Sequence, residues 1–288
     1  MKKKGVGIAA GHHPTGMTGG GDPSQAYIKM RQDGSVDLIV GSCDIGQGAK
    51  TVLAQIAAEE LGIEYEQVNV INNDTDTCPI SVATVGSRVT YTDGNAVIEA
   101  AREVKQILFE VAAPELEASM DELDTAHGQI FVTSDPKRSK PIAEIARIIH
   151  FKRNDKLILG RGHYMHDDFM PNPKKGDPFA TISWGAILAE VEVDTETGEV
   201  DVLKLVTAYD VGKALNPMLV EGQIESGTMM GLGAALMEDL FPYYPSMDWQ
   251  PKTFGHYQIP TIADIPPLEM EILECPAPEG PFGAKGIG

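Results

Sequence analysis

The sequence predicts an α+β fold made of two repeated strand–strand–helix–strand subdomains. Short apolar segments come in hairpin pairs, and each pair is followed by a helical pattern and then by another strand. The second half of the chain repeats this order. Because hairpins pair their strands antiparallel, this mixture of elements argues against a doubly wound parallel sheet.

The first copy begins with a hairpin. Ala26–Met30 and Val36–Gly41 are the expected strands, and the turn at 32–35, Gln-Asp-Gly-Ser, is typical of hairpins. A helix is expected next and should end at Gly62, since apolar residues recur at helical spacing: Leu53, Ile56, Ala57 and Leu61. Val68–Ile71 then completes the copy as a buried strand.

A long helix is expected over Asn95–Ala112, with Val97, Ala101, Val104 and Leu108 on its inner face. After it, residues 114–178 contain a polar helix, Ile142–Ile149, and a loop rich in Asn, Pro, Lys and Gly. We expect the subdomain boundary in this connecting region. The predicted domains are therefore residues 1–175 and 176–288.

The second copy follows the same plan. Ala186–Val193 and Glu199–Ala208 form the hairpin, a helix runs roughly over Val220–Leu240, and Leu268–Leu273 is a strand that we expect to be buried. The segment after the second strand is similar in the two copies: Asp44-Ile45-Gly46 and Asp210-Val211-Gly212. These similarities indicate an internal repeat.

Composition narrows the possible partners and compartments. Twenty-three basic and 42 acidic residues give a net charge of −19, which would repel a phosphate backbone, so nucleic acid is not an expected partner. No apolar run approaches the ~20 residues that cross a bilayer, and no apolar segment of signal-peptide length follows the N-terminal lysines. We expect a cytoplasmic protein with no membrane partner.

The cysteines and histidines predict no metal site. Cys43, Cys78 and Cys275 lie far apart without a CxxC pair, and we expect free, mostly buried thiols rather than an iron–sulfur or zinc site. The histidines His12, His13, His163 and His166 have no familiar ligand spacing, and the last two are expected in a loop. The Gly19–Gly21 run lies in no strand–helix context, so it is not a dinucleotide fingerprint.

Three glycine-containing segments are candidates for binding. Cys43–Gly48 joins a strand to a helix, where free backbone N–H groups suit an anion, although a plain turn explains it equally well. Val82–Arg88 offers a hydroxyl and a guanidinium, or else Ser87 is only a helix cap beside a solvated Arg88. The glycine-rich helix at 221–233 requires a close neighbour, which is either a packing element or a ligand.

Together these segments resemble one family. DIGQG at 44–48, TVGSR at 84–88, YDVGKALNP at 209–217 with EGQIESG at 221–227, and GPFGAKGIG at 280–288 occur in that order. The chain resembles the C-terminal half of the large subunit of the molybdenum hydroxylases, the xanthine dehydrogenase and aldehyde oxidase family. The resemblance implies two molybdenum-cofactor-binding subdomains and a molybdopterin cofactor, in bacteria usually a dinucleotide form.

The resemblance also implies site residues. The metal would be held by the cofactor's dithiolene, so no protein metal ligand is expected. The residues matching the family's cofactor loops are Gly46, Gln47, Gly48, Gly86, Ser87, Arg88, Gln223, Lys285 and Gly286. The family's general base is a glutamate that would follow Gly288, so no catalytic residue is expected within the chain, and we expect a truncated sequence that is inactive alone.

Two further cofactor loops of the family, of the GGGFGGK and AFRGxG types, are absent from these 288 residues. We expect them on another polypeptide or upstream, in the N-terminal half of the molybdenum subunit. The other implied partners are an iron–sulfur subunit and a FAD subunit.

The implied reaction is hydroxylation of a purine, N-heteroaromatic or aldehyde substrate, with water as the oxygen source and electrons leaving through iron–sulfur clusters to flavin. The alternative is a non-catalytic assembly subunit or a degenerate relative that binds a partner.

Overall fold

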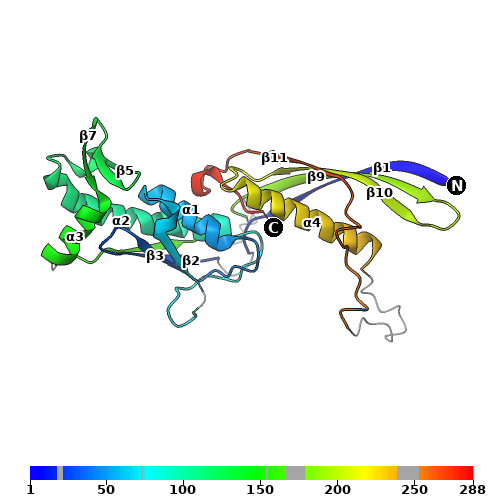
Figure 1. Cartoon of the computed structure of the whole chain (residues 1–288), viewed down its shortest axis with the longest axis horizontal. Helices are drawn as coiled ribbons and strands as arrows, with labels where there is room; N and C mark the ends of the chain where they lie inside the picture. Colours follow the sequence, from blue (N-terminus) through cyan, green and yellow to red (C-terminus); the bar gives the residue numbers. More distant parts are fainter. Residues whose placement is uncertain (18–21, 73, 154, 167–178, 239–252, 288) are drawn as a thin grey trace, which may run out of the picture. The chain divides into compact units, whose positions relative to one another are not determined.

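The computed structural model describes residues 1–17, 22–72, 74–153, 155–166, 179–238 and 253–287 (Figure 1). Their packing forms two compact units. Unit 1 comprises Met1–His12, Ser183–Cys275 and Ile287–Gly288, and unit 2 comprises His13–Ile182 and Pro276–Gly286. The division at residue 175 suggested by the sequence differs from these units at both chain ends, and as a statement about domains it stays a prediction.

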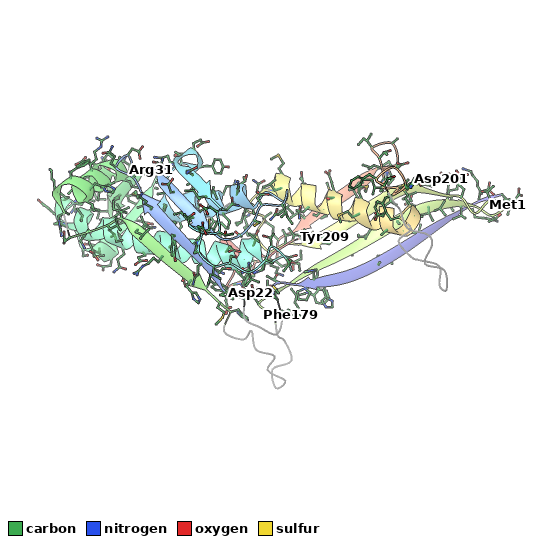
Figure 2. The ribbon with its side chains drawn as sticks, turned by 90° about the horizontal axis from the view of Figure 1, so that it is seen from below. Met1, Asp22, Arg31, Phe179, Asp201 and Tyr209 are labelled. Carbon is green, nitrogen blue, oxygen red and sulfur yellow. The ribbon has the colours of Figure 1, made fainter. Side chains whose placement is uncertain are left out.

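Unit 2 is built on a sheet in the order β4-β3-β2-β8. Strands β2 (Ser24–Met30) and β3 (Val36–Val40) form the predicted antiparallel hairpin, with Gly34 at a φ of 84° in the turn. Strand β4 (Val68–Ile71) pairs parallel to β3, and β8 (Leu159–Tyr164) pairs antiparallel to β2. In Figure 2, Asp22 and Arg31 mark the two ends of β2.

Two helices pack together over this sheet. α1 (Ala49–Leu61) ends at Gly62, whose φ of 68° and N–H bonds to the Ala58 and Glu59 carbonyls close the helix as predicted. α2 (Gly94–Glu115) lies against β8, where a side chain at Gly160 or Gly162 would overlap the helix backbone. These two glycines therefore allow the helix and the strand to approach closely.

A smaller layer follows α2. β5 (Leu123–Ala126), β6 (Gln129–Val132) and β7 (Asp135–Pro141) form an antiparallel sheet, and α3 (Ile142–Lys152) packs on β7 and α2. The sequence predicted only the helix in this region. Shorter helical turns are Tyr65–Gln67, Val89–Asp93, Met120–Glu122 and Pro281–Gly283.

Unit 1 repeats the plan. Its sheet has the order β1-β9-β10-β11, where β9 (Ile182–Asp194) and β10 (Val200–Asp210) form an antiparallel hairpin. α4 (Pro217–Leu236) follows, and β11 (Leu268–Leu273) then pairs parallel to β10. Each unit thus contains a hairpin, a helix and a parallel strand in that order. This order confirms the predicted α+β fold with its repeated strand–strand–helix–strand arrangement.

Several local predictions need correction. β1 (Lys2–Pro14) was not predicted, and the Met1 ammonium and Lys2 side chain are held by Asp194 and Asp201 at one end of unit 1 (Figure 2). β4 and β11 were expected to be buried, yet their residues are half-buried or exposed because each strand lies at the edge of its sheet. The part of the predicted connecting loop that falls on 167–178 lies outside the described residues. The helix expected over Val220–Leu240 begins at Pro217 and ends at Leu236.

Candidate cofactor-binding site

The first candidate loop, Cys43–Gly48, connects β3 to α1. Gly46 and Gly48 have φ values of 112° and 84°, a backbone region that favours glycine. Among the described residues, no heavy atom would lie within 4 Å of a side chain at Gly46. Local packing therefore does not explain this glycine, and the backbone at Gly46 is open to a ligand.

The carboxylate of Asp44 organises this loop. Its two oxygens accept hydrogen bonds from the N–H groups of Gly46 (2.9 Å) and Lys50 (3.1 Å). Partial burial acts to raise the pKa of Asp44, but the backbone N–H groups outweigh it and hold the pKa below its ordinary value. Asp44 thus already occupies part of the helix start that the sequence suggested for an external anion.

The side chain of Gln47 folds over the same loop. Its oxygen accepts a hydrogen bond from the Ile45 N–H (2.7 Å), and its amide nitrogen donates to the Cys43 carbonyl (3.2 Å). A primary amide has two N–H groups and two acceptor lone pairs, so each end of Gln47 retains capacity for a further partner. The loop fixes the orientation of the amide before any ligand arrives.

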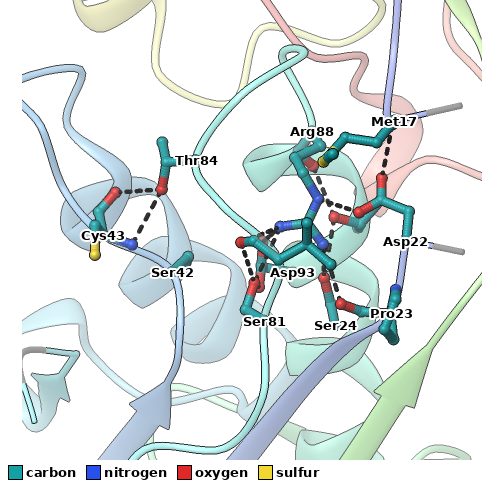
Figure 3. Close-up of polar contacts among 12 residues, drawn as sticks. Met17, Asp22, Pro23, Ser24, Ser42, Cys43, Ser81, Thr84, Arg88 and Asp93 are labelled. Atoms are coloured by element: carbon teal, nitrogen blue, oxygen red, sulfur yellow. Dashed lines mark hydrogen bonds and ion pairs between the residues drawn. The ribbon is translucent and has the colours of Figure 1, made fainter. Parts of the chain in front are cut away.

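The second loop, 81–88, is joined to the first. The Thr84 hydroxyl accepts from the Cys43 N–H (3.1 Å) and donates to the Cys43 carbonyl (2.9 Å), as Figure 3 shows. Both backbone groups of Cys43 are therefore satisfied by one side chain 41 residues away. The sequence pointed to both loops but gave no signal for this link.

Gly86 and Ser87 both have left-handed backbones, with φ values of 59° and 52°. The Gly86 carbonyl accepts a hydrogen bond from the Gly16 N–H (2.9 Å), and the Ser87 hydroxyl lies 3.5 Å from His13 Nδ1. Such a conformation is unfavourable for serine, so the surrounding contacts must hold it. The structure does not place Ser87 as a helix cap, because the helical turn after it has no side-chain cap.

Arg88 is fully buried, so the alternative of a solvated arginine is wrong. Its guanidinium lies between the carboxylates of Asp22 and Asp93, which are themselves buried (Figure 3). Burial raises the pKa of the Asp93 carboxyl above its ordinary value, although the positive charge of Arg88 opposes this shift. Arg88 is thus part of an internal ionic cluster, and its guanidinium does not face solvent.

The C-terminal segment of unit 2, Pro276–Gly286, contacts the second loop. A side chain at Gly286 would lie 1.5 Å from the Ser87 carbonyl oxygen, so the two backbones are in direct contact. Lys285 is half-buried beside it. The structure therefore brings together eight of the predicted site residues: Gly46, Gln47, Gly48, Gly86, Ser87, Arg88, Lys285 and Gly286.

Gln223, the remaining predicted residue, lies half-buried on α4 of unit 1. The Asn216 side chain caps this helix by accepting from the Leu219 N–H (3.1 Å). Of the helix glycines, Gly233 packs against Pro260, whereas no described atom would meet a side chain at Gly222, Gly227 or Gly231. Packing within the described residues explains only the last of these four glycines.

Each of the three loops in unit 2 also exposes a large apolar side chain. Ile45 is 74% exposed, Val85 47% and Phe282 44%. Phe282 in addition has a φ of 51°, which is strained for an aromatic residue. Exposed apolar side chains on adjoining loops are typical of a surface that a ligand or another polypeptide covers.

The cysteines are free, as expected, but the prediction of mostly buried thiols is wrong. Cys43 and Cys275 are exposed and Cys78 is half-buried. His163 lies in β8 rather than in a loop, and its backbone N–H donates to the Glu99 carboxylate. Within the part of the chain that the structure describes, no group of three His, Cys, Asp or Glu side chains could hold a metal, and no helix could span a bilayer.

Comparison with known proteins identifies the family. Residues 1–266 match the family model of the molybdopterin cofactor-binding domain, so the chain belongs to this family. It is 32% identical over 260 residues to the carbon monoxide dehydrogenase large chain of Hydrogenophaga pseudoflava, covering 90% of this chain and 31% of that one. The putative xanthine dehydrogenase molybdenum-binding subunit of Escherichia coli is 28% identical, covering 99% and 37% of the respective chains.

Solved structures agree. Quinoline 2-oxidoreductase from Pseudomonas putida 86 matches with a TM-score of 0.87 and 26% identity, over 99% of this chain and 36% of that one. A Cu,Mo-containing CO dehydrogenase matches with a TM-score of 0.86 and 27% identity, over 100% and 36%. The predicted resemblance to the molybdenum hydroxylases is confirmed, and the chain spans about a third of the length of these relatives.

The residues present fit a molybdopterin cofactor. The open backbone at Gly46 and the oriented amide of Gln47, with its unused N–H and lone pair, suit hydrogen bonding to such a cofactor. Sequence reasoning missed Asp44 as the organiser of the loop, although an Asp two residues before a Gly is a common turn signal. It also missed Asp22 and Asp93, whose contacts with Arg88 span 66 and 5 residues.

Proposed function

We propose that this chain supplies the cofactor-binding loops of the molybdopterin subunit in a molybdenum hydroxylase. The observation that carries the proposal is that three separate segments, 43–48, 84–88 and 284–286, contact one another through Thr84 and Ser87. All three match the family's cofactor loops. A chain that bound only a partner would not require this arrangement of strained and open backbone.

The molybdopterin cofactor, in a dinucleotide form, would supply the redox chemistry of hydroxylation with water as the oxygen source. Gln47 would orient the cofactor with its unused N–H and lone pair, and Gly46 would allow close approach to the backbone. Gly86, Ser87, Lys285 and Gly286 would line the same cradle. Gln223 would bind a further part of the cofactor from α4.

We propose partners for the exposed surfaces, since relatives are about three times as long as this chain. α4 exposes the large apolar side chains of Met218 and Met230, which are 71% and 68% exposed, and three of its glycines have no neighbour among the described residues. This surface would be covered by the N-terminal half of the molybdenum subunit. Iron–sulfur and FAD subunits would accept the electrons, and the chain alone would be inactive.

The proposed substrate is a purine, another N-heteroaromatic compound or an aldehyde. Relatives are named for xanthine, nicotine and carbon monoxide, and structural neighbours for quinoline and aldehydes. This range supports the reaction class rather than one substrate. A non-catalytic assembly role is the second candidate, favoured only by the extent of exposed apolar surface.

The test is Gln47→Ala in the complete complex purified from its native source. A hydrogen bond to a charged cofactor group is worth ~1.5–3 kcal/mol, so cofactor occupancy should fall by about tenfold or more. The unfolding free energy should fall by no more than ~1 kcal/mol, because Gln47 is half-buried and its lost hydrogen bonds lie within the loop. Molybdenum and nucleotide would be measured by elemental analysis and by mass spectrometry.

Gln106→Ala is the matched control, because Gln106 is exposed on α2 and outside the three loops. It should leave molybdenum content unchanged. A native complex that contains no molybdenum would favour the assembly role. Full molybdenum content and full turnover in Gln47→Ala would refute the role assigned to Gln47.

A further inference from the structure

Each guanidinium nitrogen of the buried Arg88 side chain donates hydrogen bonds to other groups of the protein. Arg88 has 0% exposed surface. Its partners are the Asp22 carboxylate, the Pro23 carbonyl (3.2 Å), the Ser24 hydroxyl (2.5 Å), the Ser81 hydroxyl (3.0 Å), the Val82 carbonyl (3.1 Å) and the Asp93 carboxylate (3.2 Å). A guanidinium has five N–H donors, so these six acceptors leave none for a phosphate.

These contacts close the second loop at its base. Arg88 ends the loop, and its Nη1 reaches back to Ser81 and to the Val82 carbonyl at the start of the loop. The Arg88 carbonyl in turn accepts from the N–H and hydroxyl of Thr92, at 2.8 and 3.0 Å. Both ends of the segment 81–88 are therefore fixed to one side chain.

The closed loop carries the contacts of both other loops. Thr84 holds Cys43 of the first loop, and Ser87, the residue before Arg88, lies against Gly286. The left-handed backbone of Ser87 places its carbonyl where only a glycine fits at position 286. An anchor at Arg88 thus holds Ser87 in an unfavourable conformation that the terminal segment needs.

We propose that Arg88 is a positioning residue, which sets the backbone of Ser87 and thereby the place of Lys285 and Gly286 without contacting the cofactor. The proposal deepens the proposed function and rests on it for the meaning of these loops. It assigns the TVGSR motif two separate roles. Gly86 and Ser87 face the site, whereas Arg88 supports them from the interior.

The terminal segment has a second support that does not involve Arg88. Pro281 packs on the start of α2, where its Cγ would lie 2.7 Å from a side chain at Gly94. The Asn95 side chain donates to the Glu279 carbonyl (2.9 Å). Loss of the Arg88 anchor should therefore loosen residues 284–287 while 279–281 stay in place, a pattern that general destabilisation would not produce.

The experiment is hydrogen–deuterium exchange on the 288-residue chain carrying Arg88→Lys. Lysine keeps the positive charge between the two carboxylates but lacks the fork that reaches Ser81 and Ser24. Exchange should become about tenfold faster at 83–88 and 284–287 and stay near wild type at Glu279 and Gly280 and in α2. Should Arg88→Lys fail to fold, Ser81→Ala removes one loop contact and should give the same pattern, more weakly.

Arg31→Lys is the matched control. Arg31 contacts the Asp37 carboxylate through two nitrogens and lies at the end of β2 opposite Asp22 (Figure 2). It should leave exchange at 83–88 unchanged. Leu108→Ala, a buried change in α2, reports uniform loss of stability. If Arg88→Lys gives uniform acceleration like Leu108→Ala, or no local change, the positioning role is wrong.

Cofactor content separates this inference from the proposed function. In the complete complex, Arg88→Lys should lower molybdenum content by about tenfold, and restoring arginine should restore it. If the wild-type complex contains no molybdopterin, the proposed function is wrong. Faster exchange at 83–88 and 284–287 in Arg88→Lys would still support the anchoring role of Arg88. Wild-type exchange at 83–88 and 284–287 would overturn the anchor, whatever the molybdenum content.

Discussion

The two units share a strand order but differ in how their helices are buried. In unit 2, α1 lies against α2, and seven of its residues are buried, among them Leu53, Ile56 and Leu61. In unit 1, α4 is longer and rich in apolar residues, yet only Val220, Ile224, Thr228 and Gly233 are buried. The same topology therefore gives a closed core in one unit and an open one in the other.

The sequence repeat therefore specifies the order and connectivity of the elements, but not how closely each helix packs on its sheet. A helix in a folded domain normally buries most of its large apolar side chains. α4 departs from this rule within the described residues, since Met218 and Met230 remain largely exposed. The partner proposed above for the α4 surface would account for this departure.

The largest expected effect is the contrast between a buried residue of α1 and an exposed apolar residue of α4. Ile56→Ala in α1 should cost ~2–5 kcal/mol of unfolding free energy, because the side chain is 1% exposed. Met230→Ala in α4 should cost less than ~0.5 kcal/mol in the chain alone. Denaturant unfolding of both variants measures the difference.

The contrast should change when the proposed partner is present. Met230→Ala should then weaken association with the N-terminal half of the molybdenum subunit roughly tenfold, since an apolar side chain at an interface loses its buried contacts. Equal costs for Ile56→Ala and Met230→Ala in the isolated chain would contradict the view that unit 1 is the open one.

The second prediction compares glycines. Gly162→Ala would place a side chain 1.8 Å from the Ala96 carbonyl oxygen and separate β8 from α2, at a cost of ~1–3 kcal/mol. Gly7→Ala in β1 meets no heavy atom within 4 Å and should change stability by less than ~0.5 kcal/mol. Thermal unfolding of the pair measures both, and a stable Gly162→Ala variant would show that β8 and α2 are less closely packed.

The sequence predicted the elements whose signals are local. The hairpin turn at Gly34, the helix end at Gly62 and the bounds Val68–Ile71 and Leu268–Leu273 all agree with the structure, since each depends on neighbouring residues. The candidate loops were found by family motifs. Their contacts were not, because Thr84 meets Cys43 through the tertiary fold alone.

The missed elements have little local signal. β1 begins with three lysines, contains three glycines and is exposed along nearly its whole length. β7 is mostly charged and contains two prolines. Both strands are defined by pairing with β9 and β6. The burial of β4 and β11 was misjudged because an apolar composition does not reveal that a strand lies at a sheet edge.

The third and smallest prediction uses a turn that the two units share. Asp44 Oδ1 accepts from the Gly46 N–H at 2.9 Å, and Asp210 Oδ1 accepts from the Gly212 N–H at 3.0 Å. Asp210 is buried and also accepts from the Cys275 N–H, whereas Asp44 is partly exposed and caps α1. Asp210→Ala should lower the free energy of unfolding by ~1–3 kcal/mol, and Asp44→Ala should lower it by about 1 kcal/mol.

The pH dependence identifies the contribution of Asp44. Because its pKa is lowered in the folded chain, its contribution is complete above the ordinary pKa of about 4 and is lost as the pH falls through the lower folded value. The stability difference between wild type and Asp44→Ala should therefore be constant from pH 5 to 7 and shrink below about pH 4. Asp44→Asn keeps an acceptor for the Gly46 N–H but cannot titrate, so it should fall between the two and show a smaller change with pH. Urea unfolding at a series of pH values measures all three, and a difference that grows below pH 4 would mean that the Asp44 carboxylate does not stabilise the loop through these N–H groups.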